Sequence, residues 1–462
     1  MATEATLLID FGSTYTKVTA VDVQAGEIIA TGRAYTTVDR DIMQGLDQAV
    51  ENLLKNAGRE LKFTRKLACS SAAGGLRMVA IGLVRDLTVE AANRAALGAG
   101  AKILGVYSQR LNQREIAELE QMQPDIILLA GGTDGGNTEV IEHNARALAG
   151  AELTAPVVMA GNKSAVDVVC QVLEAGGKEV RVCANVMPEL NVLQVEPARQ
   201  TIREVFMARI VQAKGLARAE QFVEGVLMPT PVAVLEAARL LAEGTPEEAG
   251  IGELLVVDIG GATTDVHSIA KGDPTRGGVT LKGLPEPFVK RTVEGDLGMR
   301  YSLACLLEQS QTHMDLVGQR DQQHWAEYLA KVQQDPAWLA TSAEEAQLET
   351  IMAQLATRIA VERHVGHLEI QYTPFGPAYL QHGKDLTQLP WIIGTGGVIV
   401  EHANPGRILA QGAACPETPM LLRPQSAQYL VDQEYIMAAM GLLAEIQPRV
   451  ALKILKSTLT PA

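Results

Sequence analysis

The chain has 462 residues, of which 47% are hydrophobic and 4% aromatic, and its formal net charge is -14. The length predicts two or more domains, and the sparse aromatics beside abundant Ala, Gly, Leu and Val are typical of α/β proteins. The negative charge and the lack of basic runs argue against nucleic-acid binding, and no segment has the length and apolarity of a membrane span. We therefore expect a soluble cytoplasmic protein without a signal peptide.

The N-terminal segment LLIDFGSTYTKVTAVD, residues 7–22, predicts a strand, a tight turn carrying an acid and hydroxyls, and a second strand. A helix is expected over residues 47–58, where a glycine ends it. Residues 67–83 predict a strand, a Ser/Gly-rich turn and another strand, and residues 89–98 a short Ala-rich helix.

Apolar runs and helical segments alternate from about residue 125. The runs DIILLAGG, PVVMAGN and EVRVCANV are followed by expected helices over residues 139–148, 165–175 and 197–211. This alternation predicts a parallel βαβαβ layer with right-handed crossovers.

The polar, acidic and Gly/Pro-containing segment 242–253 predicts a surface connection between larger units. Residues 254–269 (LLVVDIGGATTDVHSI) then repeat the design of the first hairpin. The polar segment 310–360 predicts a helical insertion, residues 391–400 (WIIGTGGVIV) a strand with a glycine-rich loop, and residues 434–446 a final helix.

Both hairpins place an acid at the end of the first strand, Asp10 in one and Asp258 in the other. A glycine-rich turn presents backbone N–H groups to phosphate, and a carboxylate at the strand end can hold Mg²⁺ through water. The hydroxyls that would add hydrogen bonds are those of Ser13, Thr14, Thr263 and Thr264. Each hairpin alone is compatible with an ordinary tight turn, but the pair predicts a clamp for a polyphosphate and its metal. Neither matches a Walker A loop or a dinucleotide-binding fingerprint.

These segments resemble those of a known superfamily. LLIDFGSTYTKV is similar to the first phosphate motif, LLVVDIGGATTDVHSI to the second and WIIGTGGVIV to the adenosine motif of the actin, sugar kinase and heat-shock chaperone ATPases. TVEGDLGMR, residues 292–300, resembles the glycine- and acid-rich turn of the chaperone branch. The resemblance implies an α/β, two-lobed actin-like ATPase fold with ribonuclease H-like lobes and inserted α/β and helical subdomains.

The resemblance also implies roles for individual residues. Asp10 and Asp258 would organise the Mg²⁺, through water, and the attacking water, with Asp265 as a further acid. The residues implied to bind nucleotide are Gly12, Ser13, Thr14, Tyr15, Lys17, Gly260, Gly261, Ala262, Thr263, Thr264, Gly295, Gly394, Thr395, Gly396 and Gly397. The residue that usually orients the water is not evident, with Asp134 as a candidate, and this departure predicts slow hydrolysis.

A closer resemblance covers nearly the whole chain. The segments ACSSAAGGLRMVAIGLV, DIILLAGGTDGGN, PVVMAGN, VMPE and TVEGDLGMRYS, together with the first hairpin, resemble the MutL/GlmL family, which is encoded beside adenosylcobalamin-dependent mutases such as glutamate mutase. This resemblance implies an accessory ATPase, with ATP and Mg²⁺ as cofactors, that reactivates the mutase by exchanging damaged cobalamin. Its partners would be the mutase subunits, and no cobalamin ligation is expected because no Asp-x-His-x-x-Gly pattern occurs.

The expected domains are an N-terminal lobe over residues 1–250 with an inserted α/β subdomain and a C-terminal lobe over residues 251–430. The second lobe is expected to carry a helical insertion at about 305–365, and residues 431–462 to form a helix that packs back on the first lobe.

The sequence also bears on three other functions. A small-molecule kinase of the same fold needs a substrate-facing base that the sequence does not show. An iron–sulfur activating ATPase needs paired cysteines, whereas these are scattered at Cys69, Cys170, Cys183, Cys305 and Cys415, and we expect them to be reduced and mostly buried. An actin-like filament or assembly role needs a self-complementary surface, on which the sequence is silent.

Two further motifs have alternative interpretations. His364 and His367 lie three apart on an expected helix, a metal-ligand spacing, although such pairs are usually solvated or capping histidines. The loop GGTDGGN, residues 131–137, is compatible with anion binding and equally with a tight βα turn. SSAAGG, residues 70–75, contains no nucleophile elbow, so a serine nucleophile is not expected.

Overall fold

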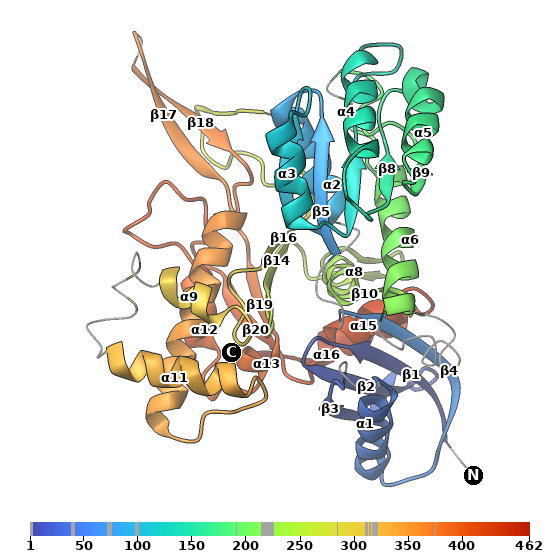
Figure 1. Ribbon diagram of the computed structural model, residues 1–462. Helices are drawn as coiled ribbons and strands as arrows, with labels where there is room; N and C mark the ends of the chain where they lie inside the picture. Colours follow the sequence, from blue (N-terminus) through green and yellow to red (C-terminus); the bar gives the residue numbers. More distant parts are fainter. Residues whose placement is uncertain are drawn as a thin grey trace. The chain divides into compact units, whose positions relative to one another are not determined.

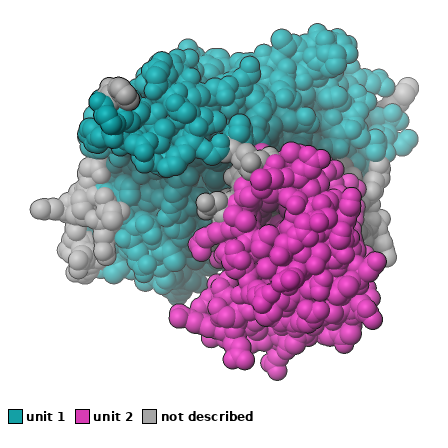
Figure 2. Space-filling view, turned by 90° about the horizontal axis from the view of Figure 1, so that it is seen from above, with its two compact units in different colours: residues 1–72, 218–462 teal, residues 73–217 magenta. Residues whose placement is uncertain are grey.

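The computed structural model forms two compact units, unit 1 with residues 1–72 and 218–462 and unit 2 with residues 73–217 (Figures 1 and 2). The structure describes the following residues: 3–37, 42–71, 76–97, 101–190, 192–213, 226–283, 285–309, 313, 316, 322–374 and 376–462. Among these residues, no helix is both long enough and apolar enough to cross a bilayer.

The first sheet of unit 1 has the strand order β10-β4-β1-β2-β3. β1, β2 and β3 are antiparallel neighbours, whereas β4 is parallel to β1 and β10 is parallel to β4. The strands are β1 (Thr3–Phe11), β2 (Tyr15–Asp22), β3 (Glu27–Tyr35), β4 (Leu61–Ser70) and β10 (Val226–Pro229). Helix α1 (Ile42–Ala57) packs on β2 and β3 through Leu46, Ala49 and Leu53, which recur at helical spacing. The predicted first hairpin and helix are confirmed.

The second sheet of unit 1 has the order β16-β14-β13-β19-β20-β21 and repeats the first. Its strands are β13 (Leu254–Ile259), β14 (Thr264–Ile269), β16 (Val289–Glu294), β19 (Trp391–Thr395), β20 (Gln428–Asp432) and β21 (Leu459–Pro461). Hairpin β13–β14 is extended by antiparallel β16 on one side and by parallel β19 and β20 on the other. Two sheets with the same ribonuclease H-like order confirm the expected fold class.

Three helices share one hydrophobic core with strands of both sheets. Helix α8 (Thr230–Glu243) contacts β4 and β10 of the first sheet and β13 and β14 of the second, and α15 (Met437–Ala444) packs on α8, β1 and β4. A Cβ atom at Gly441 would collide with the backbone of Ala233, so α8 and α15 cross closely because this position is glycine. The final helix expected over residues 434–446 is not the last one. Pro448 begins a further helix, α16 (Pro448–Thr458), where its missing N–H costs nothing.

The region predicted to be a helical insertion contains two long helices, as far as the structure describes it. They are α11 (Gln322–Gln334) and α12 (Ala343–His364), and the short α9 (Leu303–Gln309) precedes them. Ser342 and Glu345 form a capping box at the start of α12. This helix packs on β13, β14 and β16, and Ile351, Leu355 and Ile359 lie in the core of the second sheet.

The smaller elements of unit 1 lie after its main strands. Residues 242–253, predicted to be a surface connection, contain the two-strand ladder of β11 (Gly244–Thr245) and β12 (Glu248–Ala249). Short helices α13 (Gly397–Val400) and α14 (Gly406–Leu409) follow β19. A separate three-stranded sheet has the order β15-β18-β17, with strands β15 (Val279–Leu281), β17 (His367–Thr373) and β18 (Gly376–His382).

Unit 2 is a parallel sheet in the order β6-β5-β7-β8-β9, which confirms the predicted parallel layer. Its strands are β5 (Leu76–Gly82), β6 (Ala101–Ser108), β7 (Ile126–Leu129), β8 (Val157–Met159) and β9 (Val180–Val182). Its helices are α2 (Arg85–Leu97), α3 (Gln113–Met122), α4 (Glu139–Ala149), α5 (Val166–Ala175) and α6 (Glu196–Ala213). In chain order this is the doubly wound 2-1-3-4-5 arrangement. Residues 72–75 of the Ser/Gly-rich turn before β5 lie outside the described residues.

All five cysteines are free thiols, as expected. The expectation that most are buried is wrong, because Cys69 is buried, Cys305 is exposed and the other three are intermediate. On α5 the buried positions are Val169 and Leu173, so the helical period turns Cys170 away from the core.

Candidate functional site

The two predicted hairpins close in the same way. The N–H of Gly12 donates to the carbonyl of Tyr15 at 3.1 Å, and the N–H of Gly260 donates to the carbonyl of Thr263 at 2.9 Å. A Cβ atom at Gly12 would lie 2.5 Å from the Tyr15 oxygen, so a side chain there would disrupt the turn. The repeat seen in the sequence is therefore also a repeat in backbone geometry.

The two turns lie against each other. A Cβ atom built on Gly261 would lie 2.8 Å from the hydroxyl oxygen of Thr14, which belongs to the other hairpin. That hydroxyl is buried and has no hydrogen-bond partner among the described residues. Since buried polar atoms are usually paired, an unpaired hydroxyl between two glycine-rich turns is the kind of group that a ligand satisfies.

The negative charge of Asp10 is balanced by neighbouring side chains. It is 3% exposed, and its carboxylate lies 2.7 Å from Nζ of Lys17. The hydroxyl of Thr230 donates to Asp10 Oδ1 at 2.6 Å. Burial and the Asp10 charge raise the pKa of the Cys69 thiol, which therefore stays protonated and donates to the same oxygen at 3.6 Å. The sequence analysis included Lys17 but missed Thr230 and Cys69, which come from α8 and β4.

Asp258 is the opposite case. Among the described residues its carboxylate has neither a hydrogen-bond donor nor an ion-pair partner. Removal from water, followed by the charges of Asp265, Asp10 and Asp432, raises its pKa to about 7, although Lys17 opposes the shift. A divalent cation beside Asp258 would relieve this repulsion.

Asp265 forms a buried ion pair. Its carboxylate forms an ion pair with Arg291 at 2.7 Å, in which both side chains are almost inaccessible to solvent. It also accepts a hydrogen bond at 3.0 Å from the hydroxyl of Thr263, in the second turn. Asp265 therefore fixes a turn residue, and its own charge is balanced.

The region of the expected adenosine motif has two faces. The hydroxyl of Thr395 donates to Asp432 at 2.9 Å inside the core, and Gly394 is packed against Ile399 and Leu409. In contrast, a Cβ atom at Gly397 would meet nothing within 4 Å. Gly397, one of the four residues predicted in this motif, thus faces open space. The buried acid Asp432, which contacts Thr395, was not predicted from the sequence.

The predicted residue Gly295 lies beside the second hairpin. The hydroxyl of Ser302 donates to the carbonyls of Gly295, at 2.7 Å, and of Ala262, at 3.0 Å. A Cβ atom at Gly298 would collide with the backbone of Ala262. The glycine- and acid-rich turn after β16 is therefore packed directly on the second glycine turn.

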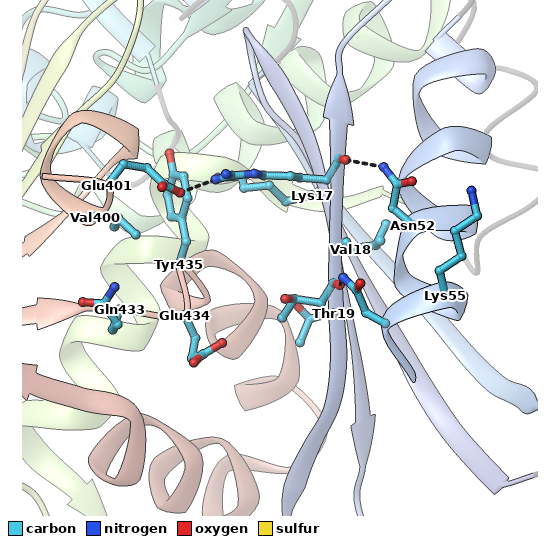
Figure 3. A pocket seen from close by; sticks show the side chains of 14 residues that line it. Lys17, Val18, Thr19, Asn52, Lys55, Val400, Glu401, Gln433, Glu434 and Tyr435 are labelled. Carbon is cyan, nitrogen blue, oxygen red and sulfur yellow. Dashed lines mark hydrogen bonds and ion pairs between the residues drawn. The ribbon is translucent and has the colours of Figure 1, made fainter. Parts of the chain in front are cut away.

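A polar pocket of about 510 Å³ lies next to the hairpins (Figure 3). It lies between β2, β3 and α1 on one side and residues 400–401 and 433–435 on the other, and neither glycine turn lines it. Arg33 and Glu401 form an ion pair at 2.5 Å across it, and Asn52 donates to the Arg33 carbonyl at 3.0 Å. Lys17 is shared by this pocket and by the acid cluster, so the two regions adjoin at its side chain.

The expectation that His364 and His367 share a helix is wrong. His364 is the last residue of α12 and is fully buried, with its ring nitrogens 2.8 Å from the Ser268 hydroxyl and 2.9 Å from the Thr292 hydroxyl. His367 begins β17 and stacks on His382 with 4.8 Å between ring centroids. No group of three or more potential metal ligands of the His, Cys, Asp and Glu types occurs in the described part of the chain.

In unit 2, the loop that contains Asp134 is held by its own hydrogen bonds. Asp134 accepts from the Asn185 side chain at 2.9 Å and from the backbone of Lys163 at 3.1 Å. Asn162 accepts from the N–H of Gly135 at 3.1 Å and donates to the carbonyl of Gly136 at 3.1 Å. These contacts are those of a tight βα turn, and the carboxylate of Asp134 is engaged within it.

Comparison with known proteins identifies the family. The family model described as MutL protein matches residues 6–459. The chain is also 53% identical, over 458 residues, to Protein MutL of Clostridium tetanomorphum, with 99% of each chain covered. The chain belongs to the MutL protein family.

Solved structures show more distant similarity to this MutL-family chain. The ethanolamine utilization protein EutJ of Carboxydothermus hydrogenoformans is 11% identical with a TM-score of 0.28, and 97% of this chain and 89% of that chain are covered. Gluconate kinase of Lactobacillus acidophilus is 10% identical with a TM-score of 0.34, and the coverage is again 97% and 89%. These scores are low, so we base the fold on the two sheet orders.

Proposed function

We propose that this MutL-family chain binds Mg-ATP between its two glycine hairpins and hydrolyses it slowly. In this proposal it is an accessory chaperone that reactivates an adenosylcobalamin-dependent mutase, glutamate mutase or a similar aminomutase, by exchanging damaged cobalamin. The observation that carries the ATP part is the contact between Thr14 of one turn and Gly261 of the other, with an acid at the end of the strand before each turn.

The residues fit the groups that they would hold. Backbone N–H groups of residues 13–14 and 261–263, the hydroxyl of Thr14 and the ammonium of Lys17 would bind the phosphates. Asp10 and Asp258 would hold Mg²⁺ through water, and the ion would neutralise charge on the phosphates. Asp258, with its pKa near neutrality, would be able to exchange a proton with water.

The way in which the two hairpins are built into unit 1 supports a chaperone role. One hairpin belongs to each sheet, and α8 and α15 join the sheets. A polyphosphate that contacts both turns would favour one arrangement of the sheets, and hydrolysis would release that preference. A client that binds the two arrangements with different affinity would then be opened or released, and that difference limits the effect.

Reactivation of an inactive mutase tests the proposal. Glutamate mutase is inactivated with hydroxocobalamin and then incubated with the protein, Mg-ATP and adenosylcobalamin, and recovery of mutase activity is followed. We expect recovery that requires hydrolysable ATP and a complex whose stability depends on the nucleotide. Absence of recovery, with no complex in any nucleotide state, would refute the chaperone role, and phosphate release measured in parallel tests the ATPase independently.

A further inference from the structure

The turn between β20 and α15 carries the chain from the second sheet to a helix that packs on the first. Asp432 fixes this turn, because its carboxylate accepts the N–H groups of Ile436 and Met437, each at 2.9 Å. The N–H of Tyr435 also donates to the Asp432 carbonyl at 2.9 Å. The position of Tyr435 is therefore fixed by the turn through which the chain passes from one half of unit 1 to the other.

Tyr435 has an unusual backbone conformation for a large residue. Its φ is 53°, in the left-handed region that glycine and asparagine adopt far more readily than a bulky side chain. Such strain persists where the surrounding structure requires it and is concentrated at functional sites. Here it is accompanied by a specific contact of the ring.

The ring of Tyr435 lies under the ammonium of Lys17, with Nζ 3.7 Å from the ring centroid. The same nitrogen lies 2.7 Å from the carboxylate of Asp10, so the ammonium is held between a ring and a carboxylate (Figure 3 shows Lys17 and Tyr435). Burial would lower the pKa of Lys17, but the nearby Asp10, Tyr435 and Asp258 outweigh it and raise the pKa above its usual value. Lys17 is charged, and an aromatic face is a favourable neighbour for a partly desolvated cation.

We propose that Tyr435 is a positioning residue for Lys17. Its ring holds the ammonium beside Asp10 and links the position of Lys17 to the turn that joins the two halves of unit 1. This inference rests on the proposed function, in which Lys17 contacts the bound polyphosphate. It predicts that the ring face is needed and that the phenol hydroxyl is largely dispensable.

Two substitutions separate these parts of the side chain. Tyr435→Phe keeps the ring, whereas Tyr435→Leu removes it at similar hydrophobicity. We expect kcat for ATP hydrolysis to fall about tenfold in Tyr435→Leu and less than about threefold in Tyr435→Phe, because the cation–π contact requires the ring face. Tyr372→Leu, on β17 and 83% exposed, is the matched control and should keep the turnover of the unaltered protein. Equal turnover in the Leu and Phe variants, with folding intact, would overturn the proposal.

A nucleotide-free measurement makes the test independent of ATPase activity. Lysines are labelled with ¹³C at the ε-carbon, and the Lys17 signal is assigned by its loss in Lys17→Arg. We expect an upfield ring-current shift of the Lys17 ε-CH₂ in the unaltered protein and in Tyr435→Phe, and its loss in Tyr435→Leu. An ordinary lysine chemical shift in the unaltered protein refutes the positioning role. A shifted signal in a protein that neither binds nor hydrolyses ATP instead refutes the proposed function and supports the placement of Lys17.

Discussion

The two hairpins share a backbone design but differ in charge balance. In the first, Asp10 is matched by Lys17 at 2.7 Å and by the Thr230 hydroxyl at 2.6 Å. In the second, removal from water and the charges of three other carboxylates raise the pKa of Asp258 to about 7. The backbone turn is thus repeated, while residues from elsewhere in the chain pair the acid of the first hairpin with a cation and leave the acid of the second among like charges.

The turns themselves are the part that the two hairpins have in common, and disrupting one should have the largest effect. We expect Gly261→Val to abolish Mg-ATP binding, because its side chain would enter the space beside the Thr14 hydroxyl and hold phosphate away from the backbone. Isothermal titration calorimetry measures the loss.

Gly277→Val is the matched control for this substitution, since a Cβ atom there meets nothing within 4 Å. This variant should bind Mg-ATP like the unaltered protein. Unchanged affinity in Gly261→Val would show that the second turn does not approach the phosphates.

The acids should both matter for hydrolysis, despite their different surroundings. We expect Asp10→Asn and Asp258→Asn each to lower kcat by about 10²-fold or more, since each removes charge that would hold the metal and its water. Phosphate release under saturating Mg-ATP measures this, with circular dichroism to confirm folding. If both variants hydrolyse ATP at the original rate, the pair of acids has no part in the chemistry.

In the nucleotide-free protein, replacing the two acids should change the free energy of unfolding in opposite directions. Asp10→Asn leaves the ammonium of Lys17 without its carboxylate, and we expect a loss of about 3 kcal/mol in the free energy of unfolding. Asp258→Asn removes a carboxylate from a repulsive, partly buried site, and we expect a gain of about 2 kcal/mol at pH 8 after allowing for solvent screening.

The pH dependence of the free energy of unfolding is a second measurement of the difference between the two acids. The pKa of Asp258 is raised in the folded state, so between about pH 4 and pH 7 the folded protein binds more protons there than the unfolded chain. The contribution of Asp258 to the free energy of unfolding therefore falls as pH rises through this range. Asp258→Asn should lack this part of the fall in stability. Urea titrations at several pH values test it, and identical pH profiles for the two proteins would contradict the assignment.

Local sequence patterns predicted the hairpins because each one is encoded in a few consecutive residues. The apolar run before Asp10 and the glycine after it require no distant contact, and the same holds for Asp258. The residues that set the charge balance around the acids could not be predicted in this way. Thr230, Cys69 and Asp432 lie at strand ends and at a helix start, far along the chain from the hairpins that they contact or influence.

One of the missed residues had a usable signal. Asp432 ends the apolar strand QYLVD and precedes a helix, which repeats the pattern of an acid at the end of a core strand. Thr230 had none, because a threonine after a proline at the start of a helix usually indicates only a helix terminus. Similarly, the exposed or buried state of a cysteine depends on the rotation of its helix about the core, which composition does not contain.

The hydrogen bond that distinguishes Asp10 from Asp258 should stabilise the protein by less than the ion pair of Asp10 with Lys17. Thr230→Val keeps the shape of the side chain and removes its hydroxyl, which donates to Asp10 at 2.6 Å in a buried site. We expect a loss of about 2 kcal/mol in the free energy of unfolding, because a hydrogen bond to a buried carboxylate is lost and one oxygen keeps only the weak Cys69 donor. Urea denaturation measures it.

A double-mutant cycle shows whether this loss belongs to the Asp10 charge. In the Asp10→Asn background the acceptor is neutral, so Thr230→Val should cost only about 1 kcal/mol, and the two substitutions should couple by about the same amount. A coupling energy near zero would mean that the hydroxyl does not stabilise the carboxylate. The charge of Asp10 would then be balanced by the ion pair with Lys17, whose ammonium lies over the ring of Tyr435.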